Sequence, residues 1–242
     1  MRKYILLNAL IGIGLLFSSC GDRVIKGEGT VGSVNPKVSS FNAVQIELPL
    51  KVVINVQKGA QPSVKFTGYA SFLLNIRTKV ENNMLFISSA LDDRMAMDSK
   101  TVVAEITVPQ LTELYLSSTA DADIHGNIVG QACKVEVTGN SKVNIDNVNT
   151  DNFSFSASGT DNLNINGGNT RIATYTIDGG SLVKAFPLQT KEASVTIKGS
   201  GNCEVTALKK LNTNVAGSCS VKYKGHPAIT KNPTGGTIDD AN

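Results

Sequence analysis

The sequence predicts an all-β protein built as a single-stranded β-solenoid, with glycine-centred bends and coils of about 20 residues. Three observations predict this fold. Apolar and polar residues alternate with a period of two along most of the chain, which is typical of half-buried strands. No amphipathic run long enough for three helical turns interrupts them. The second half carries a repeat of about 20 residues, as expected of stacked units that share one core.

The N-terminus has the pattern of a bacterial lipoprotein signal peptide over residues 1–19. Arg2 and Lys3 form a positive start, residues 5–17 are apolar but short for a membrane span, and small residues precede Cys20. We expect cleavage before Cys20 and lipidation of its thiol, which would anchor the chain in the cell envelope at the outer membrane. The alternative is an ordinary secretory signal followed by an incidental cysteine.

We expect residues 20–40 to form a lipidated N-terminus and a tether, because they are rich in Gly, Ser and Lys and lack sustained periodicity. Val24, Ile25 and Val31 are available there for one short strand. The solenoid head domain is expected to span residues 41–242, with the tail acting as its C-terminal cap.

Strands are expected first at residues 44–48, 52–56 and 64–66, where apolar residues alternate with polar ones between Gly- and Asn-rich turns. Residues 69–76 fit either a short helix or a bent strand, because eight residues are too few to establish a period. Residues 91–100 have the composition of a loop.

The repeat follows, with one apolar pattern around each of five bend glycines: Gly139, Gly159, Gly179, Gly199 and Gly217. A degenerate copy centres on Ser118, and successive centres are 21, 20, 20, 20 and 18 residues apart. Glycine suits a bend because the missing Cβ permits a positive φ or a close backbone approach. A meander of antiparallel hairpins is the alternative, but the near-constant spacing favours a solenoid.

Stacking the copies about 4.8 Å apart aligns equivalent residues into columns. One outward column is predicted to contain Asn144, Asn164, Lys184, Glu204 and Lys222. Asparagine in such a column can hydrogen-bond along the stack. We take this column, called the predicted ladder below, as the candidate binding surface.

The sequence predicts no catalytic or metal site and no cofactor. His125 and His226 are too few for a zinc site. Asp161 and Asp178 lie at repeat bends where the neighbouring copies carry no acid, so they form no glycosidase-like pair. The remaining acids considered for calcium lack a recognisable loop spacing and are expected on a solvated face: Asp92, Asp93, Asp98, Asp121 and Asp123.

Four cysteines occur, and with Cys20 lipidated the other three cannot all pair within one chain. Cys203 takes the place of core residues in the repeat, and Cys219 lies at a bend. We expect Cys133, Cys203 and Cys219 to be small core or bend residues, with a disulfide or a metal site as the alternative.

Charge and aromatic content argue against two kinds of partner, nucleic acid and sugars stacked on aromatic rings. The 242 residues include 23 basic and 20 acidic side chains, and removal of Arg2 and Lys3 leaves 21 against 20, or +1. No basic patch for nucleic acid is therefore expected. With no Trp and five Tyr, a lectin that stacks sugars on aromatic rings is disfavoured, whereas binding through polar columns is not.

The order of the whole pattern resembles the GIN-domain family of auto-transporter adhesin-like lipoproteins. The resemblance rests on FNAVQIELPLKVVINVQKGAQPSVKFTG, then VVAEITVPQLTELYLSS, then the glycine-centred copies up to the ending Tyr223-Lys224-Gly225-His226-Pro227. It implies a β-solenoid related to pectin-lyase-like β-helices, an adhesive role and a homotrimer, and it supplies no catalytic residues.

We therefore expect a non-enzymatic cell-envelope lipoprotein that binds an extracellular polymer, such as a glycan or matrix component, or a host surface. An envelope carbohydrate-active enzyme of the β-helix type is one alternative. A structural scaffold that assembles with itself is the other.

Overall fold

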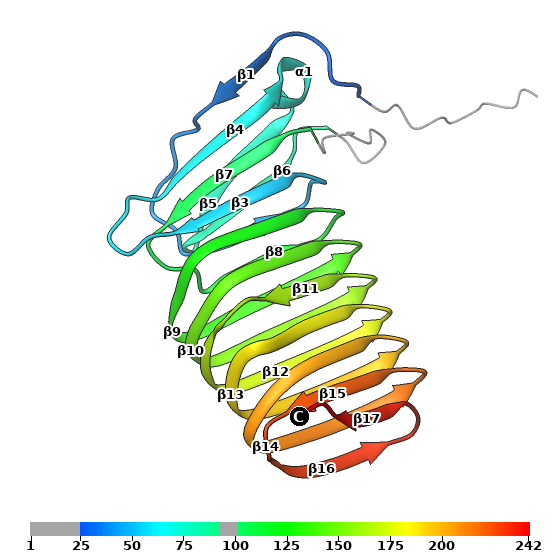
Figure 1. Cartoon of the computed structure of the whole chain (residues 1–242). Coiled ribbons are helices and arrows are strands. Elements are labelled where there is room, and N and C mark those ends of the chain that lie inside the picture. Colours follow the sequence, from blue (N-terminus) through cyan, green and yellow to red (C-terminus); the bar gives the residue numbers. More distant parts are fainter. Residues whose placement is uncertain (1–24, 92–100) are drawn as a thin grey trace, which may run out of the picture.

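The computed structural model describes residues 25–91 and 101–242, which form a β-solenoid of about six turns with coils of about 20 residues (Figure 1). The predicted fold class is confirmed. The predicted signal peptide, Cys20 and residues 92–100 of the expected loop lie outside the described residues. The described part of the chain contains no helix with the length and hydropathy that a membrane span needs.

Seventeen strands and one short helix make up the described chain. The single helix, α1 (Ala70–Leu73), falls in the segment for which helix and bent strand both remained open. The strands are β1 (Val31–Val34), β2 (Ala43–Ile46), β3 (Lys51–Val56), β4 (Ser63–Tyr69), β5 (Ile76–Glu81), β6 (Met84–Ser89), β7 (Val103–Val108), β8 (Glu113–Leu116), β9 (Asp121–Gly139), β10 (Lys142–Gly159), β11 (Asn162–Ile165), β12 (Gly168–Gly179), β13 (Leu182–Gly199), β14 (Asn202–Gly217), β15 (Ser220–Lys224), β16 (Ala228–Pro233) and β17 (Thr237–Asp240).

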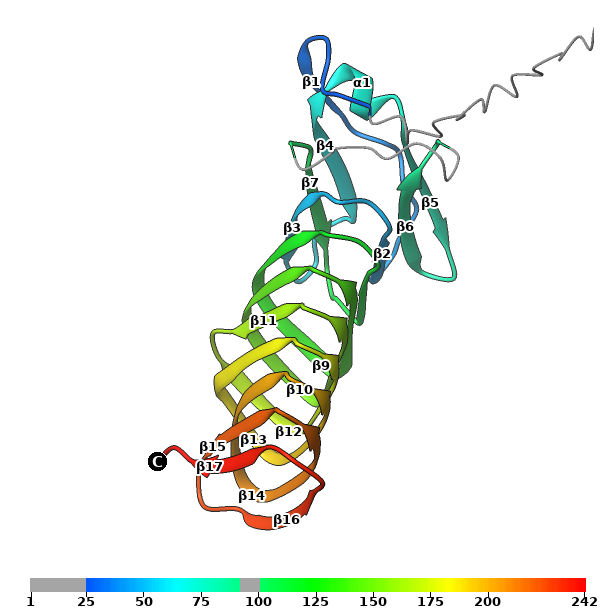
Figure 2. The same cartoon turned by 90° about the vertical axis from the view of Figure 1, so that its right-hand side faces the viewer.

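Each coil has three sides, which we name from the coil that begins with β10. Side B is residues 142–145, side C is residues 147–150, and side A is residues 152–158. A strand such as β10 runs around all three sides because its hydrogen bonds to the next coil continue through the corners (Figure 2). Neighbouring coils pair in parallel, so each side becomes one continuous sheet.

The parallel register places like residues above like residues. On side B, Val143 pairs with Leu163 and Leu163 with Val183, and all three are fully buried. On side A, the middle coils fill the interior with aromatic rings, and the centroids of Phe153 and Tyr175 lie 6.2 Å apart. The alternation read from the sequence thus becomes a single core whose columns run along the solenoid axis.

The bend glycines join side A to side B, and all five have a positive φ. At Gly159, φ is +138°, and a Cβ would lie 2.2 Å from the carbonyl oxygen of Gly139 in the preceding coil. The same carbonyl accepts the N–H of Thr160 at 3.0 Å. Glycine is therefore required here both by the backbone conformation and by the close approach of the neighbouring bend.

A second column, buried inside the bends, contains Ser141, Asp161 and Ser181. Each side chain accepts a hydrogen bond from the preceding coil: Ser141 Oγ from Ala120 N–H, Asp161 Oδ1 from Ser141 N–H, and Ser181 Oγ from Asp161 N–H. The two serines also donate to a bend carbonyl, whereas Asp161 Oδ2 has no partner among the described residues. Burial raises the pKa of Asp161, against the opposing effect of the bond from Ser141 N–H.

At the head end the coils do not follow chain order. β2 lies between β6 and β8, and β3 lies between β7 and β9, all in parallel. The chain therefore makes the second coil first, runs outward, and makes the end coil before it returns to the stack. Antiparallel strands close this end: β5 pairs with β6, β4 with β7, and β1 with β4.

At the tail end, β16 pairs in parallel with β14 and β17 pairs with β15. Residues expected to act as a cap thus form one more coil. Two charged residues occupy inward columns there, because Lys231 pairs with Thr213 and Asp240 with Tyr223. Both charged side chains are exposed. Inward-pointing charge on an edge strand opposes pairing with a further strand.

The bend geometry predicts the effect of Gly159→Val. Valine adds strain at φ +138° and a Cβ that must displace the Gly139 carbonyl, so the free energy of unfolding should fall by roughly 2–4 kcal/mol. Gly180→Ala is the matched control, because a Cβ there meets only side-chain atoms at 3.5 Å or more. Urea unfolding of both variants tests this, and an equal loss of stability in the two would contradict it.

The interior bend column predicts that Asp161→Ser stabilises the protein by roughly 1–2 kcal/mol at pH 7. Serine can accept from Ser141 N–H and donate to a bend carbonyl, as Ser141 and Ser181 do. Because the folded pKa of Asp161 is raised, its favourable contribution is complete below the unfolded pKa and is lost as pH rises through the folded pKa. The advantage of serine should therefore grow with pH.

Thermal melts from about pH 3 to pH 8 measure this difference, since the unfolded pKa of Asp is about 3.9. Asp178→Ser, on an exposed position of the same repeat, is the control and should change stability by less than about 0.5 kcal/mol. A pH-independent difference between Asp161→Ser and the wild-type protein would show that the Asp161 carboxylate is not the cause.

Candidate functional site

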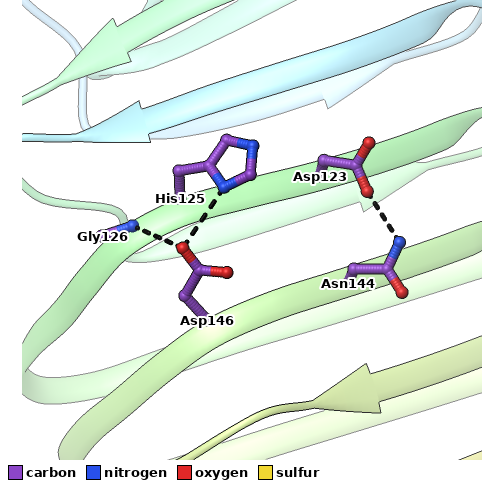
Figure 3. Close-up of polar contacts among 5 residues, drawn as sticks. All are labelled: Asp123, His125, Gly126, Asn144 and Asp146. Carbon is purple, nitrogen blue, oxygen red and sulfur yellow. Dashed lines mark hydrogen bonds and ion pairs between the residues drawn. The ribbon is translucent and has the colours of Figure 1, made fainter.

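The two histidines, and those of the acids considered for calcium that lie in the described residues, form no metal centre there. No group of three or more His, Cys, Asp or Glu side chains in the described residues is arranged to hold a metal ion. Asp92, Asp93 and Asp98 lie outside those residues. His226 is exposed near the tail, and His125 meets a single carboxylate, Asp146, at 3.2 Å (Figure 3).

The His125 contact belongs to a β-bulge at the corner between sides B and C. Two residues, His125 and Gly126, lie opposite Asp146 alone, where the register of β9 and β10 shifts. Asp146 Oδ2 accepts the Gly126 N–H at 3.2 Å and lies at the same distance from His125 Nδ1 (Figure 3). The carboxylate thus accepts a backbone N–H that the bulge leaves without a partner in the pairing of β9 with β10. We assign this pair a structural role.

The predicted ladder forms one column on side B. Asn144 pairs with Asn164, Asn164 with Lys184, Lys184 with Glu204, and Glu204 with Lys222. The register extends it to Asp123 at one end and Asp239 at the other. From Lys184 to Asp239 the charges alternate in sign, so neighbouring coils attract one another.

Part of the predicted ladder is already occupied by contacts within the protein. Asn144 Nδ2 donates to Asp123 Oδ1 at 2.6 Å (Figure 3), and Asn164 Nδ2 donates to Asn166 Oδ1 at 2.9 Å. A shallow hollow beside the column is lined by Lys142, Asn144, Asn162, Leu163, Asn164, Leu182 and Lys184. The first contact joins two coils and the second lies within one coil, and together they leave only some groups of the column free for a ligand.

The three described cysteines are free and buried. Cys203 points inward in the column of Val183, as its place in the repeat indicates. Burial raises the pKa of the Cys133 thiol to about 12 and raises that of Cys203 further. Neither thiol has the thiolate character that a nucleophile or a metal ligand needs.

Side A carries a surface that the sequence analysis missed. Its two central outward columns contain only uncharged polar residues over four coils. We call these eight residues the polar array: Ser154, Ser156, Thr174, Thr176, Ser194, Thr196, Asn212 and Asn214. The signal was present as a polar residue three and five positions before each bend glycine from Gly159 to Gly217.

Toward the head, the polar array meets a hollow around Tyr115. Its lining includes Thr112, Glu113, Tyr115, Gln131, Lys134, Asn152 and Ser154. The Tyr115 hydroxyl bonds to Glu113, and Lys134 Nζ lies 3.4 Å from that hydroxyl and 4.9 Å from the ring centroid. Lys134 also forms an ion pair with Glu136 at 2.7 Å.

These contacts shift two pKa values. The hydrogen bond to Glu113, followed by burial, raises the pKa of Tyr115, and the bond to Glu136 raises that of Lys134. The phenol therefore stays protonated and the ammonium stays charged at neutral pH. Glu113 and Glu136 both accept hydrogen bonds within the protein. The ring of Tyr115 and the polar side chains that line the hollow can orient a ligand by ring contact and hydrogen bonds.

Most of the chain matches one known protein family. Residues 40–227 match the model of a family described as "Putative auto-transporter adhesin, head GIN domain". No curated protein matches the chain.

Several crystal structures share the fold. One of a putative adhesin from Bacteroides fragilis is 20% identical, with a TM-score of 0.79 over 89% of this chain and 99% of that one. One of a putative adhesin from Parabacteroides merdae is 18% identical, with a TM-score of 0.71 over 91% and 100%. A structure from Parabacteroides distasonis described as a putative lipid binding protein is 20% identical, with a TM-score of 0.70 over 91% and 100%. Because the family model spans most of the sequence, this chain belongs to the GIN-domain family of adhesin-like head domains.

Proposed function

We propose that the protein is a non-enzymatic adhesin of the cell envelope, held by a lipid on Cys20, whose solenoid binds an extracellular polymer. One observation carries the proposal: the in-register coils repeat the same outward polar positions along a whole face. A repeated surface can contact successive units of a repetitive ligand, so many weak contacts add up to firm attachment. Membership of an adhesin-like family supports the same reading.

The contacts in the Tyr115 hollow favour binding over catalysis. A glycosidase needs two carboxyl groups that flank the bond, one of them protonated and free to donate. Glu113 lines this hollow and Glu136 lies beside Tyr115 on the next strand, but each accepts a bond from the protein, and Glu136 is paired with Lys134.

The tail coil argues against a scaffold that grows by stacking end on end. Lys231 and Asp240 place charge in two core columns at the exposed edge of β16 and β17. A second copy that continued the stack would bury both charges against an apolar column, at a cost of several kcal/mol each.

We expect the soluble chain from residue 21 to bind at least one polymer in a panel of neutral polysaccharides, acidic polysaccharides and matrix proteins. The bound polymer should not be cleaved. Binding is measured by biolayer interferometry, and product release is followed by reducing-end assay and chromatography. Turnover that disappears in Glu113→Gln or Glu136→Gln would replace the adhesin proposal with the enzyme alternative. The absence of any polymer ligand would also overturn it.

Lipid anchoring predicts that Cys20→Ser releases the protein from the membrane fraction. A lipidated N-terminal cysteine carries several acyl chains, which hold a protein far more firmly than one chain does. The matched control is Cys219→Ser, since Cys219 is a buried bend residue outside the signal. Fractionation of cells that express each variant tests the anchor, and membrane retention of Cys20→Ser would rule it out.

A further inference from the structure

We infer that side A is the binding face and that its ligand is an uncharged polysaccharide, seated at the Tyr115 hollow and extended along the polar array. This inference rests on the proposed polymer-binding function, and it adds the face and the chemical class of the ligand. Three properties of the surface support it: the free hydrogen-bonding groups of the polar array, the lack of charge within that array, and the aromatic hollow at its end.

The polar array has hydrogen-bonding capacity that the protein does not use. None of its eight side chains makes a hydrogen bond to another described residue. On the other sides some polar side chains are engaged between coils, since Asn144 bonds to Asp123 and Asn149 Nδ2 donates to Asn127 Oδ1, both at 2.6 Å. A ligand hydroxyl can replace water on the polar array without breaking any contact within the protein.

The charge of side A matches a neutral ligand. The polar array offers hydroxyl groups and amides, which both donate and accept as sugar hydroxyl groups do. The columns that flank it carry both signs, with Glu192 beside Lys210 on one edge and Asp178 beside Lys198 on the other. The polar array itself therefore carries no charge that would attract a sulfated, phosphorylated or uronic acid polymer.

The spacing also suits a chain of sugars. Neighbouring coils lie about 4.8 Å apart, which is close to the length of one unit in an extended polysaccharide. Each coil then presents a pair of uncharged polar side chains at the same two positions, such as Thr174 and Thr176, to one unit of the ligand.

The Tyr115 hollow provides an anchor that the flat polar array lacks. The ring of Tyr115 is half-buried and stands outward on side A, where it can pack against the apolar face of one sugar ring. Glu113, Lys134 and Asn152 line the same hollow and can bind hydroxyl groups of that unit. The anchored unit fixes the position of the chain, and the polar array binds the units that follow.

The inference is tested with the polymer found for the wild-type protein, and with a neutral β-glucan, a mannan, polygalacturonate and heparin as defined probes. Thr174→Glu with Thr176→Glu places two carboxylates in the polar array and should weaken neutral polysaccharide binding at least tenfold. Asn162→Glu with Asn164→Glu is the matched control on side B, because it adds the same charges to the neighbouring strand β11. Circular dichroism confirms that both variants fold.

Two further variants separate hydrogen bonding from repulsion. Thr174→Val with Thr176→Val keeps the shape of the side chains and removes their hydroxyl groups, so binding should again weaken. Tyr115→Ala should weaken binding about three- to tenfold through loss of ring contact.

Three other results would overturn the ligand class, the binding face or the proposed function. If the wild-type protein binds only polyanions or only protein, the ligand class is wrong although polymer binding stands. If the side B variant loses binding and the side A variants keep it, the predicted ladder is the site and this inference fails. If no polymer binds at all, the proposed function itself fails.

Discussion

Parallel, in-register hydrogen bonds join each coil to the next from β9 to β17, and every other feature of the solenoid depends on them. Because residue i always lies above the residue one coil away, a single position determines a whole column. An apolar position becomes a line of core, and a polar position becomes a line of surface. The bends stack in the same register, so Gly159 lies directly against Gly139. A Cβ at position 159 would collide with the Gly139 carbonyl, and the position therefore needs glycine.

The same constraint explains where the repeat is allowed to vary. The coil of β14 is two residues shorter than that of β13, and the register shifts occur only between Ala185 and Glu192, on side C and its corners. The coil of β9 is one residue longer than that of β10, and the extra residue forms the bulge at His125 and Gly126. Sides A and B keep their register in both cases. Irregular spacing is absorbed on side C and its corners.

The sequence was sufficient for the repeated part of the fold because one local pattern determines both the strand and its neighbour. The bend at Gly179 and the column from Asn144 to Lys222 could be located by counting. The head end could not, because β2 pairs with β6 and β8, which are separated from it by loops and an antiparallel excursion that no period encodes. Tertiary pairing decided the order of those coils, and alternation alone says only that they are strands.

The candidate site was harder to predict for a different reason. Counting finds every outward column but does not say which columns are already engaged. Asn144 and Thr174 both stand in outward columns of the repeat, yet the Asn144 side chain bonds to Asp123, whereas the Thr174 side chain makes no hydrogen bond to another described residue. That difference depends on the side-chain geometry between coils.

The position of the head end adds a constraint on how such a surface would be displayed. Lys26 and Glu28 bind Ser71 of α1, so the described chain starts at the capped head end (Figure 1). Ile25 is five residues after Cys20, a span of at most about 18 Å. A lipid on Cys20 would therefore hold the head end close to the membrane. The polar array would then extend away from the bilayer, with the Tyr115 hollow at its membrane-proximal end and the charged tail coil outermost.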